Sequence, residues 1–225
     1  MNTDSIEDQV ITHAPSQPVN IPKRRCTCCK SCSQHQYREP ESTRPIELEE
    51  LNQNLKILVL DLDETLVHCS FHPPEYYHEC VTINIDGVEY EVYVQERPFL
   101  ADFLADVMKN FYVVIFTASL SQYANPIIDL ICPTLPPQQR LFRESCTFVD
   151  GVYVKDLTIF HTPLEQVIIV DNNPFSFLLH PANAILSDTW EGDTNDTQLN
   201  SLILPILHQC IPANDIKEVL SKIPK

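Results

Sequence analysis

The sequence predicts an α/β domain built on a parallel sheet, because short buried strands alternate with a segment of helical periodicity. Three apolar runs, Leu55–Leu60, Phe111–Phe116 and Gln166–Val170, have the length and the branched or aromatic content of strands buried on both faces. Pro98–Lys109, between the first two runs, repeats its apolar residues with the period of a helix. Strands and helices in this order build a sheet with right-handed crossovers.

Three more helices are expected further along the chain. Ser119 is a suitable N-cap for a helix that runs toward Leu130. Thr197–His208 and Asn214–Lys222 are the other two helical segments.

Two β-hairpins are indicated by Asp-Gly pairs, which favour tight turns between antiparallel strands. The first joins Val81–Ile85 to Val88–Val94, and the second joins Thr147–Val149 to Val152–Val154. The first hairpin is therefore an insert between the first strand and the first helix.

Composition divides the chain into a tail and one domain. Residues 1–50 are rich in Ser, Thr, Gln, Pro and charge and show no apolar periodicity, which is typical of disorder. We predict a disordered, Cys- and Pro-containing tail over 1–50 and a single folded domain over 51–225.

Charge and hydropathy exclude several functions. The formal net charge is −16, and most of it falls after residue 54, so direct binding to nucleic acid is disfavoured. No apolar run reaches the length of a membrane span, and no secretory signal is expected at the acidic N-terminus. We expect a reducing compartment, the nucleus or the cytoplasm, with free thiols at Cys69, Cys80, Cys132, Cys146 and Cys210.

Each of the three buried runs ends in a polar cluster. These clusters are Asp61–Thr65, Thr117–Ser119 and Asp171–Asn173. Ligands bind outside the carboxyl ends of parallel strands, so the clusters should meet at one edge of the sheet. Any one of them alone is more simply a polar loop, but three such endings in the same register favour a site.

The chemistry of these clusters predicts phosphoryl transfer. Crowded carboxylates repel one another unless a cation lies among them, and Mg²⁺ suits oxygen ligands in the absence of His and Cys. A cation beside a phosphate, with a carboxylate free to attack, supports transfer through an acyl phosphate. Lys155 either pairs with that carboxylate and the phosphate or is an ordinary surface lysine, and spacing leaves both open.

Five motifs resemble those of the haloacid dehalogenase superfamily, and more closely those of the small phosphatases that act on the C-terminal repeat domain of RNA polymerase II. They are DLDETLVH (61–68), FTASL (116–120), LFRESC (141–146), YVKDL (153–157) and VDNN (170–173). The resemblance runs from about Leu55 to Ile223. It implies a Rossmann-like parallel sheet flanked by helices, with a β-hairpin insert and no large cap domain.

The resemblance also implies catalytic roles. Asp61 would attack phosphorus, and Asp63 would protonate the leaving oxygen and then activate water. Thr117 and Lys155 would hold the phosphate, and Asp171 would orient the site.

Metal and substrate contacts follow from the same resemblance. Asp61, the backbone carbonyl of Asp63, and Asn172 would bind Mg²⁺, and Arg143 would lie near the substrate. An apolar pocket for a substrate proline would be formed by Phe71, Ile83, Ile85, Val92, Leu120 and Tyr123, although all six also suit an ordinary core.

Four positions depart from the family pattern. Cys69 and Asn173 each replace a serine, and neither change removes a catalytic group. Gln95-Glu96 stands where the family tends to be basic, which argues against a preference for acidic or multiply phosphorylated peptides.

The predicted function is that of a Mg²⁺-dependent protein serine/threonine phosphatase acting through an aspartyl phosphate on proline-containing phosphopeptides, such as the RNA polymerase II repeats. One alternative is a phosphopeptide-binding module that does not turn over its ligand. The other is a small-metabolite phosphatase of the same superfamily, which typically carries a cap domain for which this chain has no room.

Four cysteines of the tail form a separate cluster. Cys26, Cys28, Cys29 and Cys32 lie among basic residues, which suits S-acylation and a lipid-anchored tail, but stable anchoring needs at least two lipid chains. Their spacing fits no standard zinc pattern, although His35 is near. Acylation, metal binding and a reduced, idle cluster all remain open.

Overall fold

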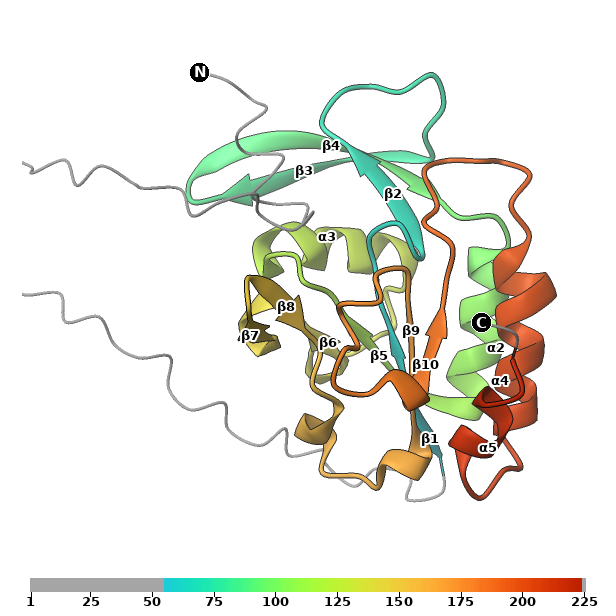
Figure 1. Cartoon of the computed structure of the whole chain (residues 1–225). Helices are drawn as coiled ribbons and strands as arrows, with labels where there is room; N and C mark the ends of the chain where they lie inside the picture. The colour runs from blue at the N-terminus through green and yellow to red at the C-terminus, as the bar shows by residue number, and fades with distance from the viewer. Residues whose placement is uncertain (1–54, 224–225) are drawn as a thin grey trace, which may run out of the picture.

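The computed structural model describes residues 55–223, so the predicted tail and its cysteine cluster lie outside the described residues. Its centre is a parallel sheet with the strand order β10-β9-β1-β5-β6 (Figure 1). The strands are β1 Lys56–Leu60, β5 Phe111–Phe116, β6 Arg140–Leu141, β9 Val167–Asp171 and β10 Ala184–Leu186. The three predicted buried strands form the middle of this sheet, whereas the edge strands β6 and β10 are too short to leave a sequence pattern.

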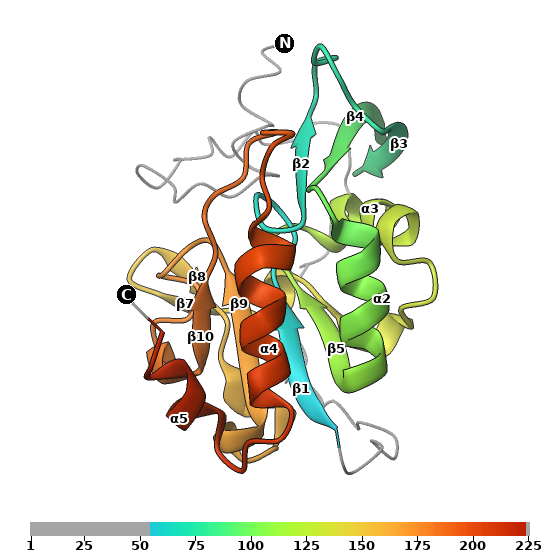
Figure 2. The ribbon, with the colours of Figure 1, turned by 90° about the vertical axis from the view of Figure 1, so that its right-hand side faces the viewer.

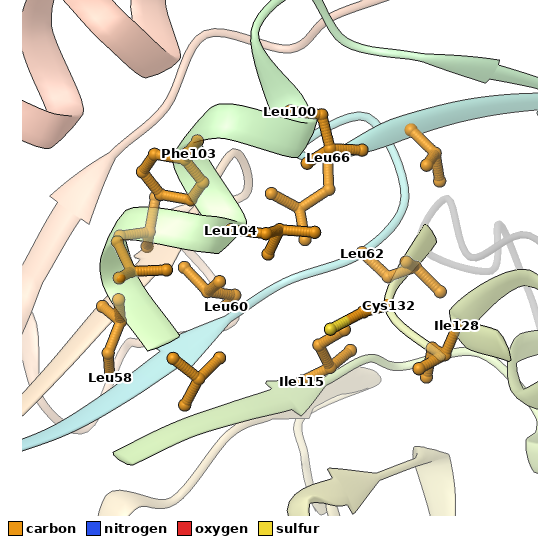
Figure 3. Close-up of a cluster of buried hydrophobic side chains, with 14 of the residues drawn as sticks. Leu58, Leu60, Leu62, Leu66, Leu100, Phe103, Leu104, Ile115, Ile128 and Cys132 are labelled. Carbon is orange, nitrogen blue, oxygen red and sulfur yellow. The ribbon is translucent and has the colours of Figure 1, made fainter. Parts of the chain in front are cut away.

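Alternation along β1 divides the core between the two faces of the sheet. Leu58 belongs to the larger core, in which helices cover the sheet, and Phe103 of the first helix packs in the same cluster (Figure 3). Val59 belongs to the smaller core on the other face, where Leu157 and Phe160 of a short 3₁₀ turn cover the strands.

Four α-helices follow the predicted segments with shorter bounds. They are α2 Leu100–Asn110, α3 Ser121–Ile131, α4 Leu204–Cys210 and α5 Ile216–Leu220. α2 and α4 lie on the same side of the sheet (Figure 2). The segment predicted as one helix from Thr197 begins with a π-helical turn, Leu199–Ile203, just before Pro205 at the start of α4. Proline lacks the backbone N–H that a regular helix would use there.

The first predicted hairpin is part of a three-stranded antiparallel sheet with the order β2-β4-β3. Its strands are β2 Val67–Ser70, β3 Glu79–Ile85 and β4 Val88–Glu96, and the sheet lies over α3 (Figure 1). Asp86 and Gly87 have φ angles of 51° and 85°, which is the backbone that a type I′ turn needs. The sequence pattern indicates β3 and β4 but not β2.

The second hairpin is confirmed as β7 Thr147–Val149 and β8 Val152–Val154. Short 3₁₀ turns make up much of the remaining chain, at Pro137–Gln139, Arg143–Ser145, Leu157–Phe160, Leu164–Gln166 and Pro181–Asn183. The predicted α/β fold with a hairpin insert is therefore confirmed, and residues 55–223 contain no cap-sized domain.

Two smaller expectations concern thiols and membranes. The five scattered cysteines of the described residues are free. Within 55–223, no helix combines the length and the apolar character needed to cross a bilayer.

Candidate active site

The carboxyl ends of β1, β5 and β9 open into one pocket of about 320 Å³. Asp61 and Asp63 follow β1, Thr117 follows β5, and Asp171 and Asn172 lie at the end of β9. All five line the pocket, so the three polar clusters share the edge at which they were expected to meet. The remaining wall comes from the second hairpin and from the turn after β9, with Gly151, Val152, Tyr153, Pro174, Phe175 and Ser176.

Lys155 holds two of these carboxylates at once. Its Nζ lies 2.5 Å from Asp61 Oδ1 and 2.6 Å from Asp171 Oδ2, and its side chain is 1% exposed. Its backbone N–H donates to the carbonyl of Ser176 at 2.6 Å, and Asn173 N–H donates to Asp171 Oδ1 at 2.8 Å. Lys155 is therefore a buried ion-pair partner of Asp61, and the surface alternative is wrong.

Asp61 Oδ2 faces a different partner from Oδ1. Thr65 Oγ1 lies 2.8 Å from Asp61 Oδ2 and 3.3 Å from Asn172 Oδ1, which brings carboxylate and amide oxygens together. Asn172 Nδ2 donates to Thr189 Oγ1 at 3.2 Å, and this bond turns the amide oxygen toward Thr65. None of the described residues that line the pocket is a His or a Cys, so the donors they offer are the hard oxygen ligands that suit Mg²⁺.

Three ionisable groups of the pocket have shifted pKa values. Burial raises the pKa of Asp63 to about 7, with further contributions from the negative charges of Glu64 and Asp61. Burial and the charge of Asp61 raise the pKa of Asp171 to about 7 as well, against the opposing charge of Lys155. Burial alone would lower the pKa of Lys155, but its two carboxylate partners outweigh burial and raise it.

Asp63 is bonded to hydroxyl groups and, among residues 55–223, to no cation. Ser119 Oγ donates to Asp63 Oδ2 at 2.8 Å, Thr117 Oγ1 donates to the same oxygen at 3.2 Å, and Tyr123 OH donates to Oδ1 at 3.0 Å. All three donors come from the end of β5 and the start of α3.

The prediction that Ser119 caps this helix is wrong. The N-cap of α3 is Leu120, and no side chain donates or accepts a capping bond there. The Ser119 side chain turns instead toward the carboxylate of Asp63 and donates a hydrogen bond to its Oδ2 at 2.8 Å. The sequence feature that indicates a place for Ser119 in the site is its position in the FTASL motif, two residues after Thr117.

Arg143 lies beside the pocket rather than in its lining. Its Nε donates to the carbonyl of Ala118 at 2.6 Å, and its guanidinium lies 5.1 Å from the centre of the Tyr153 ring. Both Ala118 and Tyr153 line the pocket. Nη2 of Arg143 is buried without a hydrogen-bond partner among the described residues, so one donor is left over next to the site.

The predicted apolar pocket is mostly filled core. Ile83, Val92 and Tyr123 are at most 1% exposed and Ile85 is 9% exposed, because the hairpin packs against α3. None of the six predicted residues lines the catalytic pocket. The two that keep some exposed surface are Phe71 and Leu120, with the Phe71 ring stacked on that of Tyr123.

Arg97 is a buried residue that the sequence analysis did not single out. Its guanidinium donates to both oxygens of Asp196 at 2.9 Å, to the carbonyl of Thr65 at 3.0 Å, to Ser187 Oγ at 2.8 Å and to Gln198 Oε1 at 3.1 Å. It therefore ties the segment after β10 to the backbone of the residue whose hydroxyl contacts Asp61. These partners are far apart in the sequence, so no local pattern marks this residue.

The parallel sheet, the hairpin insert and the carboxylates at the strand ends define a haloacid dehalogenase-like domain. Residues 56–217 match the family model described as NLI interacting factor-like phosphatase, and the chain belongs to that family. The family resemblance of the sequence motifs is thus confirmed.

Curated relatives cover most of this chain. It is 41% identical over 193 residues to the human carboxy-terminal domain RNA polymerase II polypeptide A small phosphatase 2, an alignment covering 85% of this chain and 71% of the relative. It is 45% identical over 157 residues to CTD small phosphatase-like protein 1 of Caenorhabditis elegans, covering 70% of this chain and 32% of the relative. The chain spans 55% of the length of the probable C-terminal domain small phosphatase of Dictyostelium discoideum and 32% of the length of the Caenorhabditis elegans relative.

A solved structure has the same fold. The fission yeast RNA polymerase II CTD phosphatase Fcp1, bound to beryllium fluoride, superposes with a TM-score of 0.53 at 18% identity. The match covers 76% of this chain and 54% of that chain.

Proposed function

We propose that this chain is a Mg²⁺-dependent protein serine/threonine phosphatase that acts through a phosphorylated Asp61. The observation that carries the proposal is the setting of Asp61 in the pocket. One of its oxygens is paired with buried Lys155 at 2.5 Å, and the other lies 2.8 Å from Thr65 beside Asn172. A charged carboxylate in a pocket that holds a fixed cation is suited to attack a phosphate.

The residues divide the two chemical steps between them. An oxygen of Asp61 forms a bond to phosphorus while the bond from phosphorus to the ester oxygen breaks, and Asp63 gives its proton to that oxygen. The Asp63 carboxylate then takes a proton from water, whose oxygen attacks phosphorus and displaces Asp61. Phosphate leaves, and both aspartates return to their first state. Thr117 and Lys155 hold the phosphate, and Asp171 keeps Lys155 in place.

The oxygen donors of the pocket fit a magnesium ion. Asp61, Asn172 and the backbone carbonyl of Asp63 would hold it, and the bound ion would offset the negative charge of the phosphate. Arg143 would lie near the substrate, since its guanidinium lies beside Tyr153 and its Nε donates to the carbonyl of Ala118, both of which line the pocket.

The proposed substrate is a phosphoserine or phosphothreonine in an exposed, proline-containing segment of a protein. A pocket without a cap is open to a loop or a tail, and the names of the relatives refer to the C-terminal domain of RNA polymerase II. Phe71 and Leu120 are the residues of the predicted apolar wall that retain surface for a proline ring.

We further propose a nuclear or cytoplasmic enzyme that does not bind nucleic acid, with a net charge of −16. The tail over 1–50 would be separate from the catalytic domain over 51–225 and would add membrane association if its cysteines are acylated.

A phosphopeptide panel assayed with the full chain tests this function. With Mg²⁺, we expect phosphate release from proline-containing phosphoserine peptides, loss of activity in EDTA, recovery with Mg²⁺ and poor recovery with Ca²⁺. Hydrolysis of small phosphorylated metabolites in preference to every peptide would favour the metabolite alternative. Peptide binding without phosphate release would favour the binding module.

A further inference from the structure

The hydroxyl groups around Asp63 differ in their access to the pocket. Thr117 lines the pocket and can reach a bound phosphate. Ser119 and Tyr123 do not line it, and they are 1% and 0% exposed. Their hydroxyls are both bonded to Asp63, at 2.8 and 3.0 Å. These bonds give both residues a route to the substrate through the Asp63 carboxyl group.

These two hydroxyls form hydrogen bonds with different oxygens of the Asp63 carboxyl group. Ser119 bonds to Oδ2 and Tyr123 bonds to Oδ1, so together they fix the plane of the Asp63 side chain. A buried hydroxyl without a partner is unfavourable, so these hydrogen bonds also hold the two residues in place. Thr117 contributes the weakest contact, at 3.2 Å, and is the donor that a bound phosphate would take over.

We propose that Ser119 and Tyr123 are positioning residues for Asp63, which hold its carboxyl group in the orientation for proton transfer to the ester oxygen. This inference rests on the proposed function. A hydroxyl can donate to a carboxylate or accept from a carboxylic acid, so the same two groups serve both protonation states of Asp63. A lysine at either position would bind only the charged form.

The consequence is an effect that depends on the leaving group. Serine and other alkyl alcohols are poor leaving groups and need a proton from Asp63, whereas p-nitrophenolate leaves without one. Tyr123→Phe and Ser119→Ala should each lower kcat/KM for a phosphoserine peptide by about tenfold, part of the 10²–10⁴-fold range of general acid catalysis. For p-nitrophenyl phosphate the change in kcat/KM should stay within about twofold, because kcat/KM reports the first step, in which this leaving group needs no proton.

The experiment measures kcat/KM, which reports the first chemical step, of the full chain with Mg²⁺ for a series of aryl and alkyl phosphates of rising leaving-group pKa. Wild type, Ser119→Ala, Tyr123→Phe and the control Tyr112→Phe are compared. Tyr112 is a half-buried tyrosine of β5 that does not line the pocket. The two site variants should give a steeper dependence on leaving-group pKa, and the control should follow the wild type.

A double variant separates positioning from general support of the fold. If Tyr123 acts only through Asp63, its effect should disappear when Asp63 is already substituted. Adding Tyr123→Phe to Asp63→Asn should therefore change kcat/KM less than twofold. Equal losses on all leaving groups, full additivity in the double variant, or no loss at all would overturn the inference. A wild type that hydrolyses no ester would overturn the proposed function itself, and it is the one outcome that does so.

Discussion

Asp61 and Asp63 stand two residues apart and line the same pocket, yet their surroundings differ in kind. Asp61 is bonded to the buried ammonium of Lys155 at 2.5 Å, whereas Asp63 is bonded to hydroxyl groups at 2.8 to 3.2 Å. A carboxylate paired with a buried cation suits the role of a nucleophile. Hydroxyls leave a carboxyl group free to gain and lose its proton, and burial raises the pKa of Asp63 to about 7.

The turn after β1 makes this difference possible. Leu62, between the two aspartates, is fully buried, and its carbonyl accepts from Leu66 N–H at 2.9 Å. Glu64 has a left-handed φ of 56°, which ends the extended chain directly after Asp63. The burial of Leu62 fixes the turn. The Asp61 side chain therefore points toward β8 and β9, whereas the Asp63 side chain points toward α3. Proximity in sequence therefore does not imply a shared role.

Removing the charge of Asp61 should have the largest effect on activity. Asp61→Asn cannot form the acyl phosphate, so turnover of every ester should fall to background. The fold should persist, because Lys155 keeps Asp171 as its partner at 2.6 Å. Phosphate release and circular dichroism of the purified variant are the two measurements. Normal turnover in this folded variant would contradict the assignment of the nucleophile.

Asp63→Asn should have a smaller effect, and one that varies with the substrate. Loss of general acid–base catalysis should lower kcat for phosphoserine peptides by about 10²–10⁴-fold. p-Nitrophenyl phosphate should lose less, because only its second step needs the group. A trapped phosphoenzyme with this substrate, seen by intact-mass spectrometry, would sharpen the contrast with Asp61→Asn, which should show none. Equal loss on both substrates would remove the distinction between the two aspartates.

The fold could be predicted wherever the pattern is local. β1, β5 and β9 are continuous apolar runs, and both hairpins have Asp-Gly turns, so their positions agree with the structure to within a few residues. The shared edge of the polar clusters follows from the rule that parallel strands end together. The edge strand Ala184–Leu186 has no such mark, because three residues carry no periodicity.

Details of the site depend on packing that a sequence does not display. Tyr123 and Leu120 share a helix face, but only the structure shows that the hairpin covers Tyr123 and closes the expected apolar pocket. Its hydroxyl does find a partner, as a buried tyrosine requires, and that partner is Asp63. From the sequence, Ser119 is both a suitable N-cap for α3 and part of the polar cluster Thr117–Ser119. The conformation of the chain before α3 decides between these two roles.

A substitution of Arg97 should disturb the Asp61 side of the site indirectly, through Thr65. Arg97→Met leaves Asp196 and the carbonyl of Thr65 without their donor and should destabilise the fold by about 3–5 kcal/mol, the range for breaking a buried pair. Urea unfolding measures it, with Lys217→Met as control. Lys217 pairs with Glu165 at 3.0 Å on the surface, where an ion pair contributes about 0–1 kcal/mol. Similar losses in the two variants would contradict the role of Arg97.

The smallest expected effect is the dependence of this Arg97 pair on pH. Burial alone would raise the pKa of Asp196, but the hydrogen bonds donated by Arg97 and by the backbone of Gln198 outweigh it and hold the pKa below its ordinary value. A lowered pKa in the folded state means that the charged pair stabilises the protein above the unfolded pKa of about 3.9. That contribution is lost as the pH falls through the lower, folded value.

Asp196→Asn should therefore reduce stability at pH 7 by about 1.5–3 kcal/mol, the range for hydrogen bonds to charged groups. The gap to the wild type should narrow below about pH 4, where the Asp196 carboxylate of the unfolded chain takes up a proton and that of the folded protein does not yet do so. Thermal unfolding of both proteins from pH 7 to pH 3 measures this gap. Asp129→Asn is the control, since Asp129 is 64% exposed in its pair with Arg140 and should show a small gap at every pH. The difference in stability between Asp196→Asn and the wild type could instead stay constant down to pH 3. That result would mean that the shape of the Asp196 side chain, and not its charge, matters for the support that Arg97 gives to the Asp61 side of the site.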